Sequence, residues 1–506
     1  MLNLIDTPSP TGVGLIAVGL LLLGSLYLLQ TSPSYPLVNG KKPLEFRYIH
    51  AQNRFLSDAR NLIRSGLAKW PVFNIRTETG YKLVLGPQYA NEIRSHAALS
   101  FGEAIAGDFH VQLPGFAPFK QGTRLDEIVQ DAVRMKLTQS LSNVTKPLSE
   151  ETAAALQTYW TDNSEWHSIS LKSTNLKLVA RLSSKVFLGD KLCRNPDWLR
   201  ITIAYTVDSF LAAQDLRLWP VFLRRLVSGF LPSYRKLQAE LDEARSIIIP
   251  VLEQRKAEKQ AAIARGENPK KYNDAMEWME QCAKGRPYDA AVVQLSLSLA
   301  AIHTTSDMLT QVLYDICCED GLVDELRREI MEVVQAEGWK KTTLYKLKLM
   351  DSVLKESQRL KPTGIVSMRR KAKQSITLSD GTKIPKNADL FVSSQRMWDS
   401  DFYPSPEKFI PTRFLSLRET PGHETSAQLV SPSPEHLGFG LGKHACPGRF
   451  FAANEIKIAL CHILLKYDVK LSEGWEDLKP MAVGLSLTAN PMAEVMIRRR
   501  SEEIEL

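Results

Sequence analysis

One cysteine near the C-terminus stands in a setting that suits metal chemistry. Phe439 and several glycines precede Cys446, and Pro447 and Gly448 follow it directly. Glycine lets a backbone approach a flat ligand and adopt positive φ without a Cβ clash, and proline suits the first turn of a helix. The pattern predicts Cys446 at a helix N-terminus, where free N–H groups and the helix dipole favour a thiolate. Such a thiolate could be the single axial ligand of a haem iron.

The other five cysteines indicate no second metal site. None of the six forms a C-x-x-C pair, and Cys317 and Cys318 are adjacent, so they would point to different sides of a helix. We therefore expect no zinc site and no disulfide framework, and a reducing compartment fits best. The alternative for Cys446 is a buried structural cysteine beside a turn.

A mainly α-helical body with small β-sheets is predicted to position this cysteine. Composition is ordinary over 506 residues, so we expect one large domain organised by a buried cofactor. The weakly charged, apolar stretch 289–318 is predicted to be a buried central helix. Hydrophobic periodicity predicts further helices over 234–266, 323–337, 343–360 and 446–467, and strands over 81–85, 375–378, 389–393 and 494–497.

The N-terminal segment has the character of a membrane anchor. Residues 12–29 are apolar apart from glycines and Ser25, close to the roughly 20 residues that cross a bilayer. Only Asp6 precedes the stretch, whereas Lys41 and Lys42 follow it, so the body is expected in the cytosol. We therefore predict an anchor over 1–30, a proline-rich hinge over 31–45 and a catalytic body over 46–506.

The cysteine segment resembles the haem-binding signature of the cytochrome P450 superfamily, F-x-x-G-x-x-x-C-x-G. Phe439, Gly442, Cys446 and Gly448 match its four fixed positions. The resemblance implies a cytochrome P450 fold, a haem b cofactor, and Cys446 as the ligand of the iron. It also implies a single-pass anchor in the endoplasmic reticulum membrane with a cytosolic catalytic domain.

Two further segments resemble the motif E-x-x-R and the later F-x-P-x-R-F of the same superfamily. The first is Glu356 with Arg359, and the second contributes Arg413. By resemblance, these three side chains form a buried network that supports the haem-side core. A second E-x-x-R, Glu325 with Arg328, is interpreted as a solvated surface pair.

Cations are needed for the two carboxylates of a haem. Arg369 stands seven residues after Pro362, where the superfamily usually places such an arginine, and His444 stands two residues before the cysteine. The superfamily's W-x-x-x-R signature is not visible, and Arg134 or Lys136 is the predicted substitute. Each of these residues could instead be an ordinary surface cation.

Residues 300–305 resemble the A/G-G-x-D/E-T-T motif of the superfamily's central helix. Thr304 is assigned as the hydroxyl that relays protons beside the haem. Ala301 replaces the usual glycine and His303 the usual acid, and a histidine can shuttle protons near neutral pH. The alternative for His303 is a helix-packing side chain with a satisfied hydrogen bond.

The resemblance implies a monooxygenase that uses O2 and electrons from NADPH-cytochrome P450 reductase, with cytochrome b5 as an optional further donor. Segments 300–305, 344–358 and 442–451 resemble filamentous-fungal members that oxidise terpenoids, including the ent-kaurene oxidase group and enzymes of indole-diterpene and meroterpenoid pathways. An apolar substrate arriving from the membrane is therefore expected. The predicted pocket segments are 101–116, 206–222, 296–304, 363–368 and 483–488.

The charge pattern excludes one class of partner, and two other activities remain open. The net charge of +8 is spread over scattered basic residues with no aromatic-interleaved stripe, so no nucleic-acid partner is expected. A haem-thiolate isomerase or a peroxygenase-type enzyme would need no reductase. A non-catalytic, membrane-anchored helical partner protein would require that Cys446 bind no haem.

Overall fold

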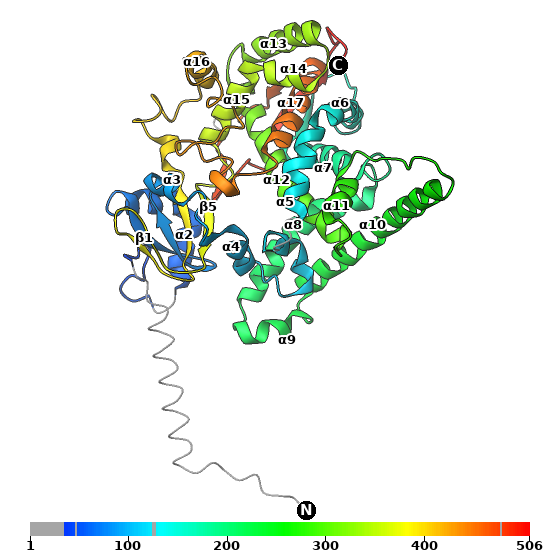
Figure 1. Cartoon of the computed structure of the whole chain (residues 1–506). Coiled ribbons are helices and arrows are strands. Elements are labelled where there is room, and N and C mark those ends of the chain that lie inside the picture. Colours follow the sequence, from blue (N-terminus) through cyan, green and yellow to red (C-terminus); the bar gives the residue numbers. More distant parts are fainter. Residues whose placement is uncertain (1–34, 46–47, 124–127, 476–477) are drawn as a thin grey trace, which may run out of the picture.

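The structure is a computed structural model that describes residues 35–45, 48–123, 128–475 and 478–506. Helices make up most of the molecule, and a smaller part built on strands lies to one side, next to α4 and α2 (Figure 1). The predicted class, mainly helical with small sheets, is confirmed.

The helices are distributed over both halves of the chain. The N-terminal half contains α2 (Ile49–Leu67), α3 (Ala90–Ile93), α4 (Phe101–Asp108), α5 (Ile128–Asp131), α6 (Thr138–Tyr159), α7 (Leu171–Leu188), α8 (Pro196–Arg217), α9 (Arg224–Ser228), α10 (Pro232–Ala264) and α11 (Ala275–Ala283). The C-terminal half contains α12 (Ala290–Cys318), α13 (Leu322–Glu337), α14 (Lys341–Lys346), α15 (Lys348–Leu360), α16 (Arg413–Glu419) and α17 (Arg449–Lys466).

Within the described residues, four small sheets complete the fold. The largest has the order β1-β2-β8-β5-β3, made of Val72–Thr77, Gly80–Leu85, Asp389–Ser393, Val366–Ala372 and Leu99–Ser100. A second has the order β4-β12-β9, made of His167–Ser170, Glu494–Arg499 and Tyr467–Leu471. The two-stranded sheets are β6-β7 (Ile376–Thr377, Lys383–Ile384) and β10-β11 (Met481–Val483, Ser486–Thr488).

Helix α12 is the central element, as predicted. The Asp289 side chain caps its first turn by accepting a hydrogen bond from the Val292 N–H. Most of its 29 residues are buried, because α7, α8, α10, α15 and α17 pack around it. Ala300 and Thr304, one turn apart on the same face, are nevertheless exposed. That face of an otherwise buried helix is the first pointer to the functional site.

Several predicted elements differ in their bounds. The helix expected over 343–360 is two helices, α14 and α15, which part at Leu347 with a non-helical ψ of 76°. The helix after the cysteine begins at Arg449 with Gly448 as its N-cap residue, so Pro447 lies before the helix and not in its first turn. The other predicted helices and strands are present within a few residues.

The predicted anchor, 1–30, lies outside the described residues, as does the start of the hinge. Among the residues that are described, no helix combines the length and apolar character that a membrane span requires. All six cysteines lie in described segments and are free, so the expectation of no disulfide holds for this part of the chain.

Candidate functional site

The loop that carries Cys446 is a tight turn held against the N-terminal part of the chain. The Cys446 N–H donates to the Phe439 carbonyl over 2.8 Å, which folds the intervening residues back on themselves. Gly442 has φ 73°, and a Cβ added there would lie 2.3 Å from the backbone oxygen of Arg94. Only glycine fits this position, both for its backbone conformation and for the close approach.

The environment of the Cys446 thiol combines opposing effects. Burial raises its pKa, while hydrogen bonds from the backbone at Gly448 and Arg449 and the charge of the Arg449 guanidinium lower it. Burial has the largest effect on the pKa, whereas the backbone N–H groups at the helix start act in the direction that the sequence predicts, toward the thiolate. A positively charged metal on the sulfur would supply the missing stabilisation.

One face of α12 is turned toward this loop. Ala300, Thr304 and Met308 follow one another at four-residue spacing on that face. The Gln358 amide nitrogen of α15 lies 3.8 Å from the Met308 sulfur, and a Cβ on Gly438 of the cysteine loop would lie 2.3 Å from the Gln358 oxygen. Gln358 therefore bridges α12 and the loop.

The accessible side chains fit a flat cofactor between α12 and the loop. Part of the Cys446 residue is accessible although protein atoms surround its thiol on most sides. Thr304 and Ala300 are also accessible, on a helix that is otherwise mostly buried. The sulfur donor, the small and hydroxyl residues opposite it and the nearby cations together match the needs of a haem. The residues present thus fit the group that the sequence predicts.

A buried arginine lies beside the loop with two of its nitrogens unpaired by any described residue. Arg370 of β5 is 2% exposed, and among the described residues its Nε and Nη2 have no hydrogen-bond partner, while Nη1 donates to the Arg369 carbonyl. Burial and then the charge of Arg370 lower the pKa of His444, so the guanidinium lies near this histidine. An unpaired, buried guanidinium next to His444 is well placed to bind a haem carboxylate.

Arg369, which is predicted from the sequence to bind a haem carboxylate, is ion-paired elsewhere. Its guanidinium contacts the Asp108 carboxylate, which also accepts from Lys82 over 2.9 Å. An irregularity in β5 explains the shift: Ser367 pairs with Val392 but Arg370 with Leu390, so one extra residue is accommodated between them. In a regular strand Arg369 would lie on the same face as Ser367. Because of the bulge, Arg370 lies on that face instead.

The Ser367 hydroxyl identifies the face of β5 that is turned to the cysteine loop. It donates to the Leu437 carbonyl over 3.1 Å. Strict alternation would place residue 369 on the same face, but Met368 has φ 54° within the bulge. In the sequence, the run Arg369-Arg370-Lys371 indicates a cation for a haem carboxylate at this point of the chain. The spacing from Pro362 does not tell which of the three residues faces the cysteine loop.

His444 and Arg134 also lie beside the cysteine loop. Burial, followed by the charges of Arg370, Lys443 and Arg134, lowers the pKa of His444 to about 4, so it is neutral at physiological pH. The Arg134 Nη2 donates to the Lys443 carbonyl over 3.3 Å and its side chain is exposed. Their predicted contacts with haem carboxylates remain predictions.

The two residues predicted to relay protons point in different directions. The Thr304 hydroxyl donates to the Ala300 carbonyl over 2.9 Å and lies on the exposed face of α12. The His303 Nε2 lies 3.1 Å from the Ile203 carbonyl of α8, an arrangement in which Nε2 carries the proton, and burial lowers its pKa. His303 thus joins α12 to α8, and its catalytic role stays a prediction.

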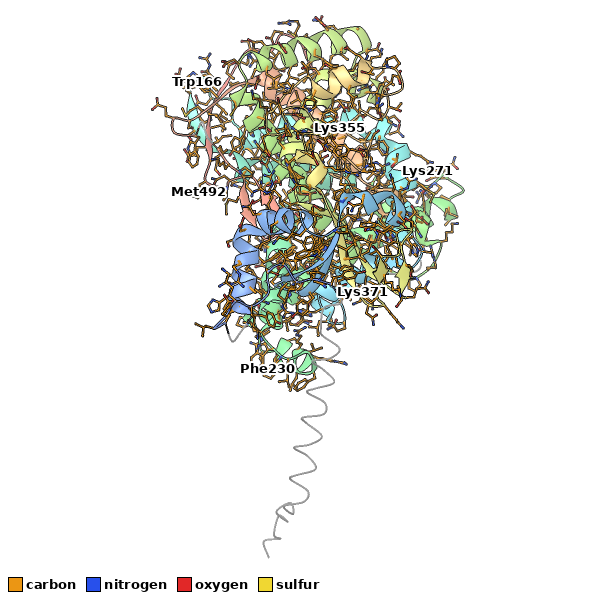
Figure 2. The ribbon with its side chains drawn as sticks, turned by 90° about the vertical axis from the view of Figure 1, so that its left-hand side faces the viewer. Trp166, Phe230, Lys271, Lys355, Lys371 and Met492 are labelled. Carbon is orange, nitrogen blue, oxygen red and sulfur yellow. The ribbon has the colours of Figure 1, made fainter. Side chains whose placement is uncertain are left out.

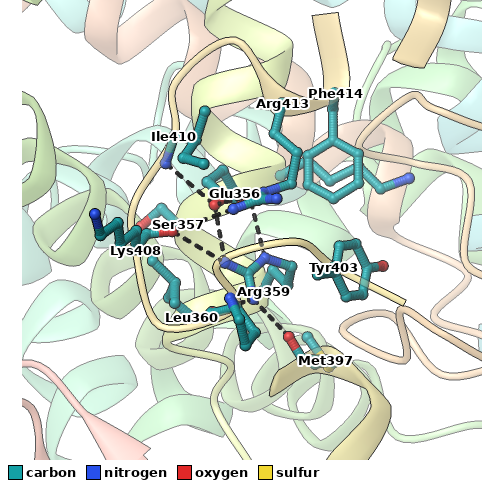
Figure 3. Close-up of polar contacts among 12 residues, drawn as sticks. Glu356, Ser357, Arg359, Leu360, Met397, Tyr403, Lys408, Ile410, Arg413 and Phe414 are labelled. Atoms are coloured by element: carbon teal, nitrogen blue, oxygen red, sulfur yellow. Dashed lines mark hydrogen bonds and ion pairs between the residues drawn. The ribbon is translucent and has the colours of Figure 1, made fainter. Parts of the chain in front are cut away.

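Glu356, Arg359 and Arg413 come together in the buried network that the sequence predicted (Figure 3). Glu356 and Arg359 are fully buried and share two hydrogen bonds of 2.8 and 2.9 Å, and the Arg413 Nε donates to Glu356 over 3.0 Å. Arg359 also donates to the carbonyls of Met397 and Pro406. The network joins α15 to the segment that leads toward the cysteine loop.

Known proteins are similar to this chain over most of its length. Residues 125–494 match the family described as Cytochrome P450. "Cytochrome P450 monooxygenase adrA" of Penicillium rubens is 51% identical, with 96% of this chain and 96% of that protein covered. "Cytochrome P450 monooxygenase trt6" of Aspergillus terreus is 49% identical, with 91% and 94% covered.

A solved structure with a similar fold is the retinoic acid-bound cyanobacterial CYP120A1. It superposes with a TM-score of 0.65, covering 92% of this chain and 100% of that chain at 19% identity. At this identity the likeness concerns the fold alone.

Replacing Glu356 by Gln is expected to lower the free energy of unfolding by about 3–5 kcal/mol, because it leaves Arg359 buried without its counter-charge. Denaturant titration measures the change. The control is Glu325→Gln in the exposed second E-x-x-R, which should stay within about 0.5 kcal/mol of the parent. Equal effects of the two substitutions would contradict the assignment.

Arg370→Gln is expected to release haem roughly 10- to 100-fold more readily, the equivalent of a lost hydrogen bond to a charged group at about 1.5–3 kcal/mol. Transfer of haem to apomyoglobin from the purified protein measures the rate. Arg369→Gln is the matched control and should have the smaller effect, since Arg369 is committed to Asp108. A larger loss with Arg369→Gln would restore the original assignment.

Proposed function

We propose that Cys446 is the iron ligand, because this chain belongs to the cytochrome P450 family and is a cytochrome P450 monooxygenase with a haem held by a cysteine thiolate. We further propose that the substrate is an apolar terpenoid-type intermediate of fungal secondary metabolism. The proposed product is a hydroxylated or successively oxidised diterpene, indole diterpene or meroterpenoid. The proposed electron donor is NADPH-cytochrome P450 reductase, with cytochrome b5 as an optional second donor. The observation that carries the proposal is the exposed face of α12 opposite the Cys446 loop.

The haem supplies the activation of O2 when bound. The chain itself contributes ligation, proton handling and exclusion of water. Cys446 binds through its sulfur, and backbone N–H groups at Gly448 and Arg449 stabilise negative charge there. The Thr304 hydroxyl, now donating back to Ala300, can turn toward the interior and hold a proton at Oγ1 beside the reacting oxygen.

An apolar substrate is supported by the side chains that face this region from α8. His303 holds Ile203 of α8 against α12, so the positions that follow at helical spacing, Val207 and Phe210, lie on the same side of α8. Both are about half exposed, and the Phe210 ring meets Phe109 edge to face at 4.9 Å. A wall of this kind suits a bulky hydrocarbon skeleton.

Attachment to the endoplasmic reticulum membrane, with the catalytic domain in the cytosol, is part of the proposal. Its support among the described residues is an apolar patch that runs from the end of α8 through α9, made of Leu218, Val221, Phe222, Leu226 and Phe230, each at least 69% exposed. Phe230 lies at one end of the molecule and Trp166 toward the other (Figure 2). Such a patch, with Arg224 and Arg225 beside it, fits a lipid surface.

The alternative, a haem-thiolate isomerase or peroxygenase-type enzyme, has one observation in its favour. No acid stands next to Thr304, and His303 is turned to a backbone carbonyl of α8. A reductase-dependent oxidation needs a proton supply at this point, whereas an isomerisation does not. Dependence on NADPH and reductase separates the two.

Full-length protein with reductase and NADPH is expected to oxidise at least one member of a panel of diterpenes, indole diterpenes and meroterpenoids, after a low- to high-spin shift of the Soret band on binding. Product analysis by mass spectrometry checks the outcome. Thr304→Ala should keep the spectral shift but form less product per NADPH consumed, and Thr304→Ser should be closer to the parent. Turnover without reductase would favour the alternative, and no shift with any scaffold would reject the terpenoid class for the compounds tested.

The full-length protein is compared in two states, in phospholipid nanodiscs and in detergent-free buffer with an amphipathic polymer. If the apolar patch contacts the membrane, amide hydrogen exchange over 218–230 is expected to be slower in the nanodiscs. Lipid would exclude water from these backbone groups. The exposed polar loop 266–272 serves as the internal control and should not change. Unchanged exchange in both segments would place the patch away from the bilayer.

A further inference from the structure

Arg449 connects the cysteine to a separate segment of the chain. Its Nη1 donates to the Cys446 carbonyl over 2.9 Å, and its Nε donates to the Val430 carbonyl over 3.0 Å. The guanidinium also stacks on the Phe450 ring, 4.5 Å from its centroid. Because Arg449 is the first residue of α17, its backbone position relative to Cys446 is set by the helix start.

The segment that receives Arg449 is itself rigidly held. Lys355 of α15 is 2% exposed, and its ammonium donates to three carbonyls of this segment, those of Ser426, Gln428 and Ser431, over 2.8–3.1 Å. The Leu429 N–H donates to Asp351 of the same helix over 2.9 Å. Val430 therefore lies between anchored residues, and its carbonyl is a fixed acceptor for Arg449.

Several arginines near α15 are paired with carboxylates. Arg359 and Arg413 share Glu356, and Arg418 faces Asp351. Within the described part of the chain, Arg449 forms no ion pair with a carboxylate, and its hydrogen bonds go to carbonyls that carry no net charge. Its hydrogen bond to the Cys446 carbonyl places the guanidinium charge directly beside the residue that carries the thiol.

We propose that Arg449 is a positioning residue that provides the counter-charge of the Cys446 thiolate. Its hydrogen bonds to the carbonyls of Cys446 and Val430 hold the cysteine in place. The inference needs only a haem-thiolate protein and does not depend on the substrate or electron donor proposed above. A fixed positive charge beside the cysteine ligand favours the reduced over the oxidised iron, since reduction adds one negative charge.

The test compares full-length, haem-loaded Arg449→Gln and Arg449→Lys with the parent. Spectroelectrochemical titration without substrate measures the reduction potential, and the reduced carbon monoxide spectrum measures the fraction that keeps thiolate ligation. Arg449→Gln is expected to lower the reduction equilibrium constant about tenfold, equivalent to about 59 mV for one electron, and to lose part of the thiolate form. Arg449→Lys, which keeps the charge, should stay nearer the parent in both.

Arg396→Gln is the matched control, because Arg396 is another half-buried arginine of the C-terminal half but is paired with Glu435 at 3.4 Å. It should leave the potential close to that of the parent. A haem-bound Arg449→Gln whose potential moves no further than that of Arg396→Gln overturns the proposal. If Arg449→Gln does not retain haem, retention by Arg449→Lys supports the counter-charge and loss in both overturns it.

Discussion

The buried carboxylate of Glu356 is the constraint on which the C-terminal half of this protein depends. A charge with no exposure to water is costly unless every oxygen has a donor. Here the donors come from Arg359 in the same helix, from Arg413 and from the Ile410 backbone N–H. Satisfying one carboxylate thus fixes a long irregular segment against α15, and that segment runs directly into the loop of Cys446.

Helix α15 extends this principle over its whole buried face. Ser352 accepts hydrogen bonds from the N–H groups of Phe414 and Leu415, and the Lys355 ammonium donates hydrogen bonds to three carbonyls between 426 and 431. Gln358 touches both Met308 and Gly438. A segment with little regular structure satisfies its backbone groups on the side chains of one helix, which explains why so polar a helix face is buried.

The electrostatics of the site follow from this scaffold. The Cys446 sulfur lies in a buried place that raises its pKa, and the structure sets against this two backbone N–H groups and the charge of Arg449. On the other side of the cysteine loop, Arg370 is a second buried cation with unpaired nitrogens. The two cations are held by different elements, α17 and β5: Arg449 is hydrogen-bonded to the Cys446 carbonyl, and Arg370 lies near His444.

The sequence by itself determined the features that depend on short spacing. The i, i+3 relation of Glu356 and Arg359, the glycines before Cys446 and the apolar length of α12 are local, because neighbouring residues set helix faces and tight turns. Tertiary structure decided the rest. Whether Arg369 or Arg370 faces the cysteine loop depends on a bulge in β5, which strand pairing imposes. The carbonyls that receive His303 and Arg449 belong to α8 and to residue 430, because long-range packing, and not spacing along the chain, selects the partners of buried polar groups.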